Sequence, residues 1–195
     1  MLFPYKPKMG EEMRALALGL ALAAMAAPAF AAGLKVTSPE FKNGGPMPQA
    51  AVFNSFGCTG GNHSPALSWS GEPKGTKSFA ITMFDTDAPT GSGFWHWTVF
   101  NIPPDVHSLP ADAGAEASSA LPQGAGEGRN DYGLSHYGGP CPPPGPAHHY
   151  HITVYAVKVA KLPLNANSSG AVVGFNLHFN TLAKGQVVGR YGREK

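Results

Sequence analysis

Apolar and polar residues alternate with a period of two in three segments of the chain. These segments span residues 79–85, 95–102 and 150–158, and they are rich in valine, isoleucine, threonine and aromatic residues. Successive side chains of a β-strand point to opposite faces of a sheet, so the pattern predicts three half-buried strands. Residues 66–70 carry a weaker form of the pattern and predict a fourth strand.

Near the C-terminus the apolar residues take the spacing of an α-helix. They lie three or four positions apart, as on one helical face: Val172, Phe175, Phe179 and Leu182. Ser168 or Ser169 can cap the start of this helix, and Gly185 can end it. We therefore expect one helix here, the one convincing helix after residue 31.

Turn-forming residues are abundant, with 25 glycines and 19 prolines among 195 residues. Residues 103–128 are rich in small residues and proline, which predicts a long surface loop with at most one helical turn. Strands dominate this pattern and long loops join them. The expected fold is mainly β: a two-sheet, mostly antiparallel sandwich with short peripheral helices and the C-terminal helix.

The N-terminus has the organisation of a secretory signal. Three basic residues precede Ala15, the apolar run ALALGLALAAMAA follows, and Ala29 with Ala31 forms a small-x-small cleavage motif. The apolar run is short for a membrane span, although an uncleaved anchor is the alternative. We expect residues 1–31 to be a cleaved signal peptide, residues 32–195 to form a single domain, and the protein to be periplasmic or secreted.

The charge balance excludes a nucleic-acid-binding surface. The net charge is +2, charged residues make up 13% of the chain, and no run of lysine or arginine occurs. Binding to phosphate backbones needs clustered cations. Beyond residue 31 there are 11 basic and 10 acidic residues, so the mature protein is nearly neutral.

The chain has two cysteines, Cys58 and Cys141. In an exported protein an even count favours one disulfide. It would close a loop of more than eighty residues and stabilise the fold by roughly 4 kcal/mol on the chain-entropy model. The alternative is two buried free thiols.

Residues 85–97, DTDAPTGSGFWHW, place a carboxylate near a histidine. One strand ends at Asp85, a turn follows, and the next strand contains His96, so the two side chains are expected side by side. A carboxylate beside an imidazole fixes its tautomer and favours its protonated form. For Asp87, which precedes Ala88 and Pro89, an Asx hydrogen bond within the turn is the alternative role.

Residues 138–157, GGPCPPPGPAHHYHITVYAV, deliver histidines to a strand from a stiff loop. His148 and Tyr150 project to one face, and His149 and His151 to the other. His149 and His151 have the spacing of two zinc ligands, but a zinc site needs a third ligand and usually a fourth. The sequence has no further H-x-H pair, no H-E-x-x-H motif and only two cysteines. We therefore predict neither metal nor cofactor.

A nucleophile is hard to identify. The G-x-S-x-G motif is missing, and Ser92 lies in a turn with nothing to mark it as activated. A Cys141–His148 pair would be possible only if Cys141 were not in a disulfide. No glycine-rich loop opens a helix after a strand, so a nucleotide has no cradle.

Two blocks, residues 56–103 and 128–157, resemble the bacterial, Raf-kinase-inhibitor-like branch of the phosphatidylethanolamine-binding proteins. The motifs that carry the resemblance are D-x-D-A-P-T-G-S-G-x-W-H-W, G-G-P-C-P-P and H-x-Y. The family fold is a two-sheet β-sandwich with peripheral helices, which agrees with the strand pattern. His149 stands where an arginine is usual in the family.

The resemblance implies a small cavity that binds anions such as phosphate, phosphorylated head groups and acetate. The matching positions are Asp85, Asp87, His96, Gly139, Cys141, Pro142, His148 and Tyr150. In this arrangement both cavity histidines donate N–H groups to an oxyanion, Asp85 orients and charges an imidazole, and Tyr150 offers a hydroxyl. Amides of the glycine loop would complete the site.

The expected function is that of an exported binding or regulatory protein with an anion pocket. The resemblance also implies a kinase- or protease-type protein partner that is inhibited, and a homodimer. The alternative is a hydrolase in which the Asp/His cluster activates a water molecule. The lack of a nucleophile motif favours binding over catalysis.

Overall fold

The structure, a computed structural model, describes residues 33–194. The signal peptide expected at residues 1–31 lies outside the described residues. In the described part, no helix has both the length and the apolar character that crossing a membrane requires.

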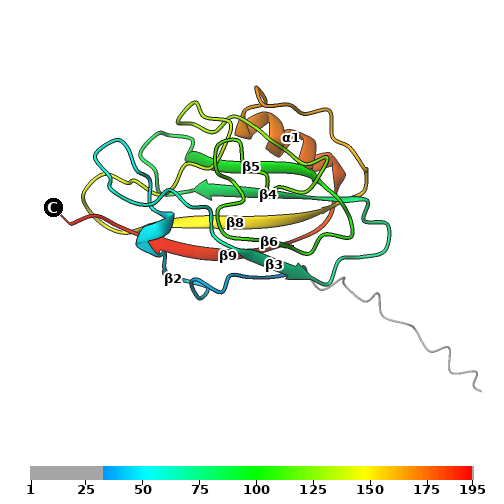
Figure 1. The fold of residues 1–195 in the computed structure, drawn as a ribbon, viewed down its shortest axis with the longest axis horizontal. Coiled ribbons are helices and arrows are strands. Elements are labelled where there is room, and N and C mark those ends of the chain that lie inside the picture. Colours follow the sequence, from blue (N-terminus) through cyan, green and yellow to red (C-terminus); the bar gives the residue numbers. More distant parts are fainter. Residues whose placement is uncertain (1–32, 195) are drawn as a thin grey trace, which may run out of the picture. The chain divides into compact units, whose positions relative to one another are not determined.

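The strands and helices follow one another from the N-terminal to the C-terminal end of the described chain (Figure 1). In order they are β1 (Lys35–Thr37), β2 (Gly45–Pro46), the 3-10 helix η1 (Gln49–Ala51), β3 (Leu67–Ser70), β4 (Ser78–Asp85), β5 (Phe94–Ile102), β6 (Ser108–Leu109), β7 (Gly126–Glu127), β8 (His148–Val157), α1 (Gly170–Asn180) and β9 (Thr181–Tyr191).

The strands form two sheets, as the sequence predicts. The larger sheet has the order β2-β9-β8-β4-β5-β7, and the smaller has the order β1-β3-β6. All pairs are antiparallel except β2 with β9, which is parallel, so the larger sheet is mixed. The four strands predicted from alternation are β3, β4, β5 and β8, and the last three lie side by side in the order β8-β4-β5.

The main core fills the space between the two sheets. It combines Trp69 of β3 and Leu109 of β6 with residues of the central strands, among them Ile81, Trp97 and Val154. A second, smaller cluster lies between the larger sheet and α1 and includes Phe100 and Leu177. The central strands are therefore covered on both faces, which explains why β4 and β5 are buried along most of their length.

The C-terminal helix forms, but its apolar stripe faces solvent. Its buried residues are Gly170, Val173 and Leu177, whereas Phe175 and Phe179 are 67% and 58% exposed. A residue larger than glycine at 170 would overlap the ring of Trp95, so the helix approaches the sheet closely at this point. The expectation that the large side chains mark the buried face of a helix fails because the smaller side chains fit against the sheet.

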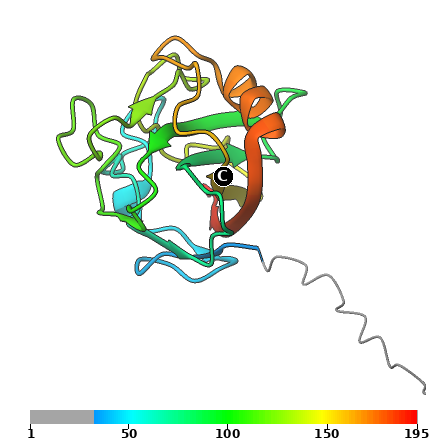
Figure 2. The same cartoon turned by 90° about the vertical axis from the view of Figure 1, so that its right-hand side faces the viewer.

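The helix also ends earlier than Gly185, the predicted stop. Ser169 caps its start, as expected, by accepting a hydrogen bond from the Val172 amide. At its other end the chain passes through Thr181 directly into β9, an eleven-residue strand that the sequence did not predict. Figure 2 shows α1 in orange leading straight into β9 in red.

Glycines inside β9 are required by close neighbours. A Cβ atom at Gly185 would lie 1.8 Å from the carbonyl oxygen of Leu34, and one at Gly189 would lie 2.4 Å from the side chain of Met47. Leu34 and Met47 pack directly against β9, so a side chain at Gly185 or Gly189 would overlap them. Gly185, interpreted from sequence as a helix stop, is thus a packing residue of a strand.

Glu127 is a partly buried carboxyl group at the end of the main core. Its Oε1 accepts a hydrogen bond from the indole Nε1–H of Trp97 at 2.6 Å. Burial raises the pKa of Glu127 to about 7, although the bond from Trp97 acts in the opposite direction. The folded state therefore binds a proton more tightly than the unfolded state between about pH 4.5 and 7.

We predict that Glu127→Gln makes the protein more stable relative to wild type as the pH rises. Wild-type stability falls as the pH rises from about 4.5 to 7, because the buried carboxyl group must ionise. The neutral amide of glutamine does not ionise, so its contribution to stability is independent of pH. The gain in free energy of unfolding should be about 2 kcal/mol larger at pH 8 than at pH 5, after discounting for partial exposure. Urea denaturation at both pH values measures it.

The exposed residue Glu116 offers the matched control, since Glu116→Gln changes the same group on the surface. A Glu127→Gln effect that is the same at both pH values would contradict the raised pKa.

Candidate ligand-binding site

The candidate site lies where three adjacent strands meet at one end of the larger sheet. β4 ends at Asp85, β5 begins at Phe94 and β8 begins at His148. Asp85 is the direct cross-strand partner of both Phe94 and Tyr150. Direct partners share a face of the sheet, so Asp85, Phe94 and Tyr150 point to the same side, and His148, two residues before Tyr150, joins them.

His96, two residues after Phe94, points to the same side, and a β-bulge lies at this position. Met83 pairs with Trp97 and Phe84 with Trp95, so His96 is an extra residue of β5 that has no partner in β4. A bulge kinks the strand and re-aims its side chains. As a result, Trp97 packs in the main core while His96, its neighbour, lines a cavity with Tyr150 at a ring-centroid distance of 5.1 Å.

The cavity has a volume of about 210 Å³. Its walls come from the ends of the three strands and from the loops that follow β4 and precede β8. The lining residues are Asp85, Ala88, Pro89, Thr90, Phe94, His96, Tyr132, Cys141, Pro142, Pro143, His148 and Tyr150. Most of this surface is apolar, and the polar groups belong mainly to the carboxylate, the two imidazoles and the phenols.

Asp85 pairs with His148 rather than with His96. The Nδ1 atom of His148 lies 2.7 Å from Oδ2 of Asp85, and both side chains are largely buried. The other carboxylate oxygen of Asp85 accepts the backbone N–H of Asp87 at 2.8 Å. The expected carboxylate–imidazole pair therefore exists, but with a different histidine, because the ring Nδ1 of His96 bonds a loop carbonyl instead.

His96 is held as a neutral imidazole. Its Nδ1–H donates to the carbonyl oxygen of Gly138 at 2.8 Å, and a carbonyl oxygen can only accept. Burial lowers the pKa of His96 to about 4, an effect stronger than the opposing effects of the hydrogen bond to the Gly138 carbonyl and of the charge of Asp85. The expectation that His96 is a charged donor to an anion is wrong for the free protein: Nε2 carries a lone pair.

Aromatic rings surround His96. Phe94, Tyr132 and Tyr150 have their centroids 5.0, 5.5 and 5.1 Å from the centroid of the imidazole. The hydroxyl of Tyr150 is buried and has no hydrogen-bond partner within residues 33–194. Burial also raises the pKa of Tyr150, so the hydroxyl keeps its proton.

Comparison with known proteins assigns the chain to a family. A family model described as phosphatidylethanolamine-binding protein matches residues 37–192. The chain belongs to the phosphatidylethanolamine-binding protein family. The resemblance noted in the sequence is thereby confirmed.

Relatives from Escherichia coli strain K12 support this assignment. UPF0098 protein YbcL is 51% identical over 180 residues, which cover 92% of this chain and 98% of that protein. UPF0098 protein YbhB is 42% identical and covers 81% of this chain and 99% of its own length. The crystal structure of E. coli YbcL, described as a new member of the mammalian PEBP family, matches with a TM-score of 0.82 and 52% identity, covering 84% of this chain and all of that one.

The structure places most of the family-derived residues around the cavity, but two of them have other roles. Oδ2 of Asp87 accepts both the backbone N–H and the ring Nδ1–H of His149 at 2.7 Å, and the ring hydrogen bond lowers the pKa of Asp87. Gly139 donates its N–H to Oδ1 of Asn62 and accepts the hydroxyl proton of Tyr132. The glycine-loop amide expected to hold a ligand is therefore already used within the phosphatidylethanolamine-binding fold.

Sequence reasoning missed several walls of the cavity, namely Ala88, Pro89, Thr90, Phe94, Tyr132 and Pro143. Phe94 could have been found, because it lies two residues before His96 at the start of the same strand. Tyr132 lies inside one of the two blocks that resemble the family, but in a loop where alternation gives no direction for its side chain.

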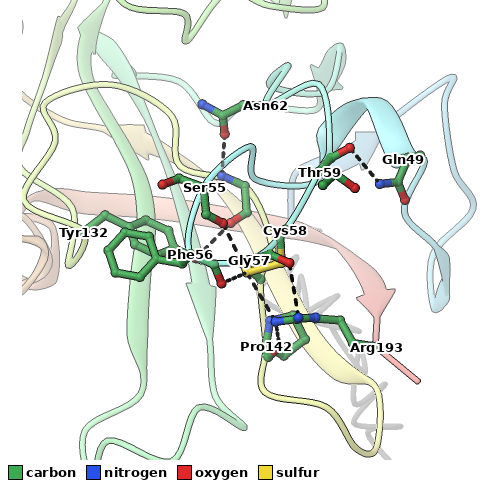
Figure 3. Close-up of a disulfide and its surroundings, with 12 residues drawn as sticks. Gln49, Ser55, Phe56, Gly57, Cys58, Thr59, Asn62, Tyr132, Pro142 and Arg193 are labelled. Atoms are coloured by element: carbon green, nitrogen blue, oxygen red, sulfur yellow. Dashed lines mark hydrogen bonds between the residues drawn. A yellow bond between two sulfur atoms is a disulfide. The ribbon is translucent and has the colours of Figure 1, made fainter. Parts of the chain in front are cut away.

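Cys58 and Cys141 form the disulfide that the sequence favoured, with a Cα–Cα distance of 5.9 Å. The bond ties a cavity-lining loop to the loop at residue 58, and the guanidinium of Arg193 lies beside it, donating to the carbonyl oxygens of Gly57 and Pro142 (Figure 3). A Cys141–His148 nucleophile is thereby excluded. Among the described residues, no cluster of three or more histidine, cysteine or acidic side chains could hold a metal ion.

We predict that the double variant Cys58→Ser/Cys141→Ser loses about 2–4 kcal/mol in free energy of unfolding, because the bond closes a loop with a sequence separation of 83. Urea denaturation with and without dithiothreitol measures the loss. Reducing agent should lower wild-type stability by a similar amount and leave the variant unchanged. Wild-type protein that is indifferent to reduction would contradict the prediction.

Proposed function

We propose that this protein is an exported member of its family that binds a small phosphate-type anion, either free or as a phosphorylated head group. The observation that carries the proposal is the convergence of two imidazoles, a carboxylate and an unpaired phenol on one cavity. These groups come from two consecutive strands, β4 and β5, and from β8, which follows about fifty residues later. Their common position gives the side chains a shared role, which burial alone does not explain.

The size of the cavity supports a small ligand. Its volume of about 210 Å³ is below the range of about 300–1,000 Å³ typical of sites for drug-sized molecules. A phosphate or phosphoethanolamine group fits that scale. Acyl chains of a phospholipid would have to lie outside this cavity.

The chemistry of His148 and Tyr150 supports an anion. When His148 is protonated, Nδ1–H donates to Asp85 and Nε2–H is left to donate to a ligand. The Tyr150 hydroxyl offers a second donor, and a buried unpaired hydroxyl costs about 1–3 kcal/mol until it finds a partner. Charge-assisted bonds of this kind are the stronger ones.

Export is supported by the signal-like N-terminus and by the disulfide, which persists in oxidising compartments. Hydrolysis by an activated water remains the alternative, and no contact within residues 33–194 favours it over binding. Inhibition of a kinase- or protease-type partner and homodimer formation stay predictions from the resemblance.

We predict that Tyr150→Phe weakens phosphoethanolamine binding by roughly 10-fold, the effect of one lost hydrogen bond to a charged group. Its thermal stability should not fall, because the hydroxyl has no partner in the described protein. Isothermal titration calorimetry and thermal unfolding measure the two effects. If Tyr150→Phe binds phosphoethanolamine as tightly as wild type, the Tyr150 hydroxyl does not contact the ligand.

The His148–Asp85 pair can be tested with His148→Asn, and His107→Asn is its matched control. His107 forms an equivalent pair with Glu72 at 3.0 Å but does not line the cavity. His148→Asn should abolish most of the binding, and His107→Asn should leave it intact. Equal losses in both variants would mean that the effect reflects general destabilisation.

We also predict that cells expressing the full chain export it. The exported fraction should contain a chain that begins near Ala32, with Cys58 and Cys141 oxidised. Cell fractionation followed by intact-mass spectrometry tests this. Recovery of the chain with residues 1–31 attached, in the cytoplasmic fraction and with free thiols, would contradict export.

A further inference from the structure

Three polar atoms of the cavity have no hydrogen-bond partner in the part of the chain that the structure describes. They are Nε2 of His96, Nε2 of His148 and the hydroxyl of Tyr150. A ligand that fills the cavity must match these atoms, because a buried polar group left unpaired is costly. Whether each atom donates or accepts therefore decides which ligand fits.

His96 can only accept. Its single proton is on Nδ1, where the carbonyl oxygen of Gly138 holds it at 2.8 Å, so Nε2 carries a lone pair. If the proton were on Nε2 instead, the lone pair of Nδ1 would face the Gly138 carbonyl oxygen, and both atoms would be acceptors. Protonating both nitrogens is opposed by burial, since the residue is 2% exposed and its pKa is lowered to about 4.

The charges around His96 also disfavour a fully ionised ligand. The titratable groups that face its ring come from β4, from β8 and from the loop between β7 and β8: Asp85, His148, Tyr150, Tyr132 and Asp131. Two of these are carboxylates, whereas the lining residues include neither lysine nor arginine, so that only a histidine could supply a positive charge. A dianion would thus meet more negative charge than positive.

We propose that the pocket selects oxyanions that keep one proton, namely phosphomonoester monoanions and hydrogen phosphates, over oxyanions of equal charge that carry none. The P–OH group of the ligand donates to Nε2 of His96. Its ionised oxygens accept from Nε2–H of His148 and from the hydroxyl of Tyr150. This inference rests on the proposed function and narrows its ligand class to phosphate esters and phosphate, excluding sulfate.

The test uses two ligands that differ in this proton alone. At about pH 5.5 the phosphate of phosphoethanolamine is mostly a monoanion, because its second pKa is near 6. Ethanolamine O-sulfate has the same length, shape and charge but no acidic proton. Calorimetric titration of wild-type protein should show phosphoethanolamine binding at least about 10-fold more tightly, because a site built to accept a hydroxyl proton rejects analogues that lack it.

The outcomes separate this inference from the function on which it rests. Equal affinity for the two esters, or tighter binding of the sulfate, would overturn the proton selection and leave anion binding standing. Binding of neither ester would overturn both. Inorganic phosphate, titrated at the same pH, distinguishes a site for free phosphate from one that needs the ethanolamine group.

His96 can be examined directly in the same titration. The ring-nitrogen signals of wild-type protein in two-bond ¹H–¹⁵N spectra should show a proton on Nδ1 of His96 before ligand is added. Phosphoethanolamine should shift its Nε2 signal, and the sulfate should not. His96→Phe keeps a ring but removes the acceptor, so its affinities for the two esters should agree within about 2-fold; a variant that still prefers the phosphate by 10-fold would overturn the assignment.

Discussion

Reciprocal hydrogen bonds between His96 and Gly138 fix the orientation and the tautomer of the His96 ring in the cavity. The ring Nδ1–H of His96 donates to the Gly138 carbonyl oxygen at 2.8 Å, and the Gly138 N–H donates back to the His96 carbonyl oxygen at 3.0 Å. The side-chain amide of Asn130 donates to that same carbonyl oxygen of His96 at 3.2 Å. A residue of β5 is thus fixed through both side chain and backbone to a loop 42 residues away. Rotation of the ring would break a buried bond, so the fold sets its tautomer before any ligand binds.

The loop that carries Gly138 is itself constrained from several directions. Asn62 donates to the Tyr137 carbonyl oxygen and accepts the Gly139 N–H, and the disulfide at Cys141 anchors the next turn. A Cβ atom at Gly139 would lie 2.1 Å from the carbonyl oxygen of Ala51. The two glycines therefore allow the loop to pack against its own neighbours. This explains why the motif is glycine-rich although its amides are not free to bind a ligand.

Alternation located the strands of the site but not the faces of all their residues. Asp85, His148 and Tyr150 could be placed because each lies on a regularly alternating strand end. His96 could be placed on the same side, but its hydrogen bond to Gly138 could not be foreseen, because that partner lies in a loop 42 residues away. The bulge that turns the neighbouring Trp97 into the core depends on the pairing of β5 with β4, which a single strand's sequence does not reveal. The same limit applies to α1, whose buried face is decided by the close approach of Gly170 to Trp95, and to β9, whose alternation is interrupted by glycines.

The histidines of this chain show why residue type alone could not assign donor and acceptor roles. His107 lies near the surface, and the hydrogen bond from its ring to Glu72 raises its pKa. His96 is near Asp85 yet has a lowered pKa, because desolvation in the core outweighs the attraction of a carboxylate that is already paired with His148. The cavity therefore presents a lone pair at Nε2 of His96, although a carboxylate lies nearby. Under the proposed anion binding, the position of protons on the ligand sets the specificity. The Gly138 carbonyl does not itself line the cavity but contributes to this selection through its hydrogen bond with His96.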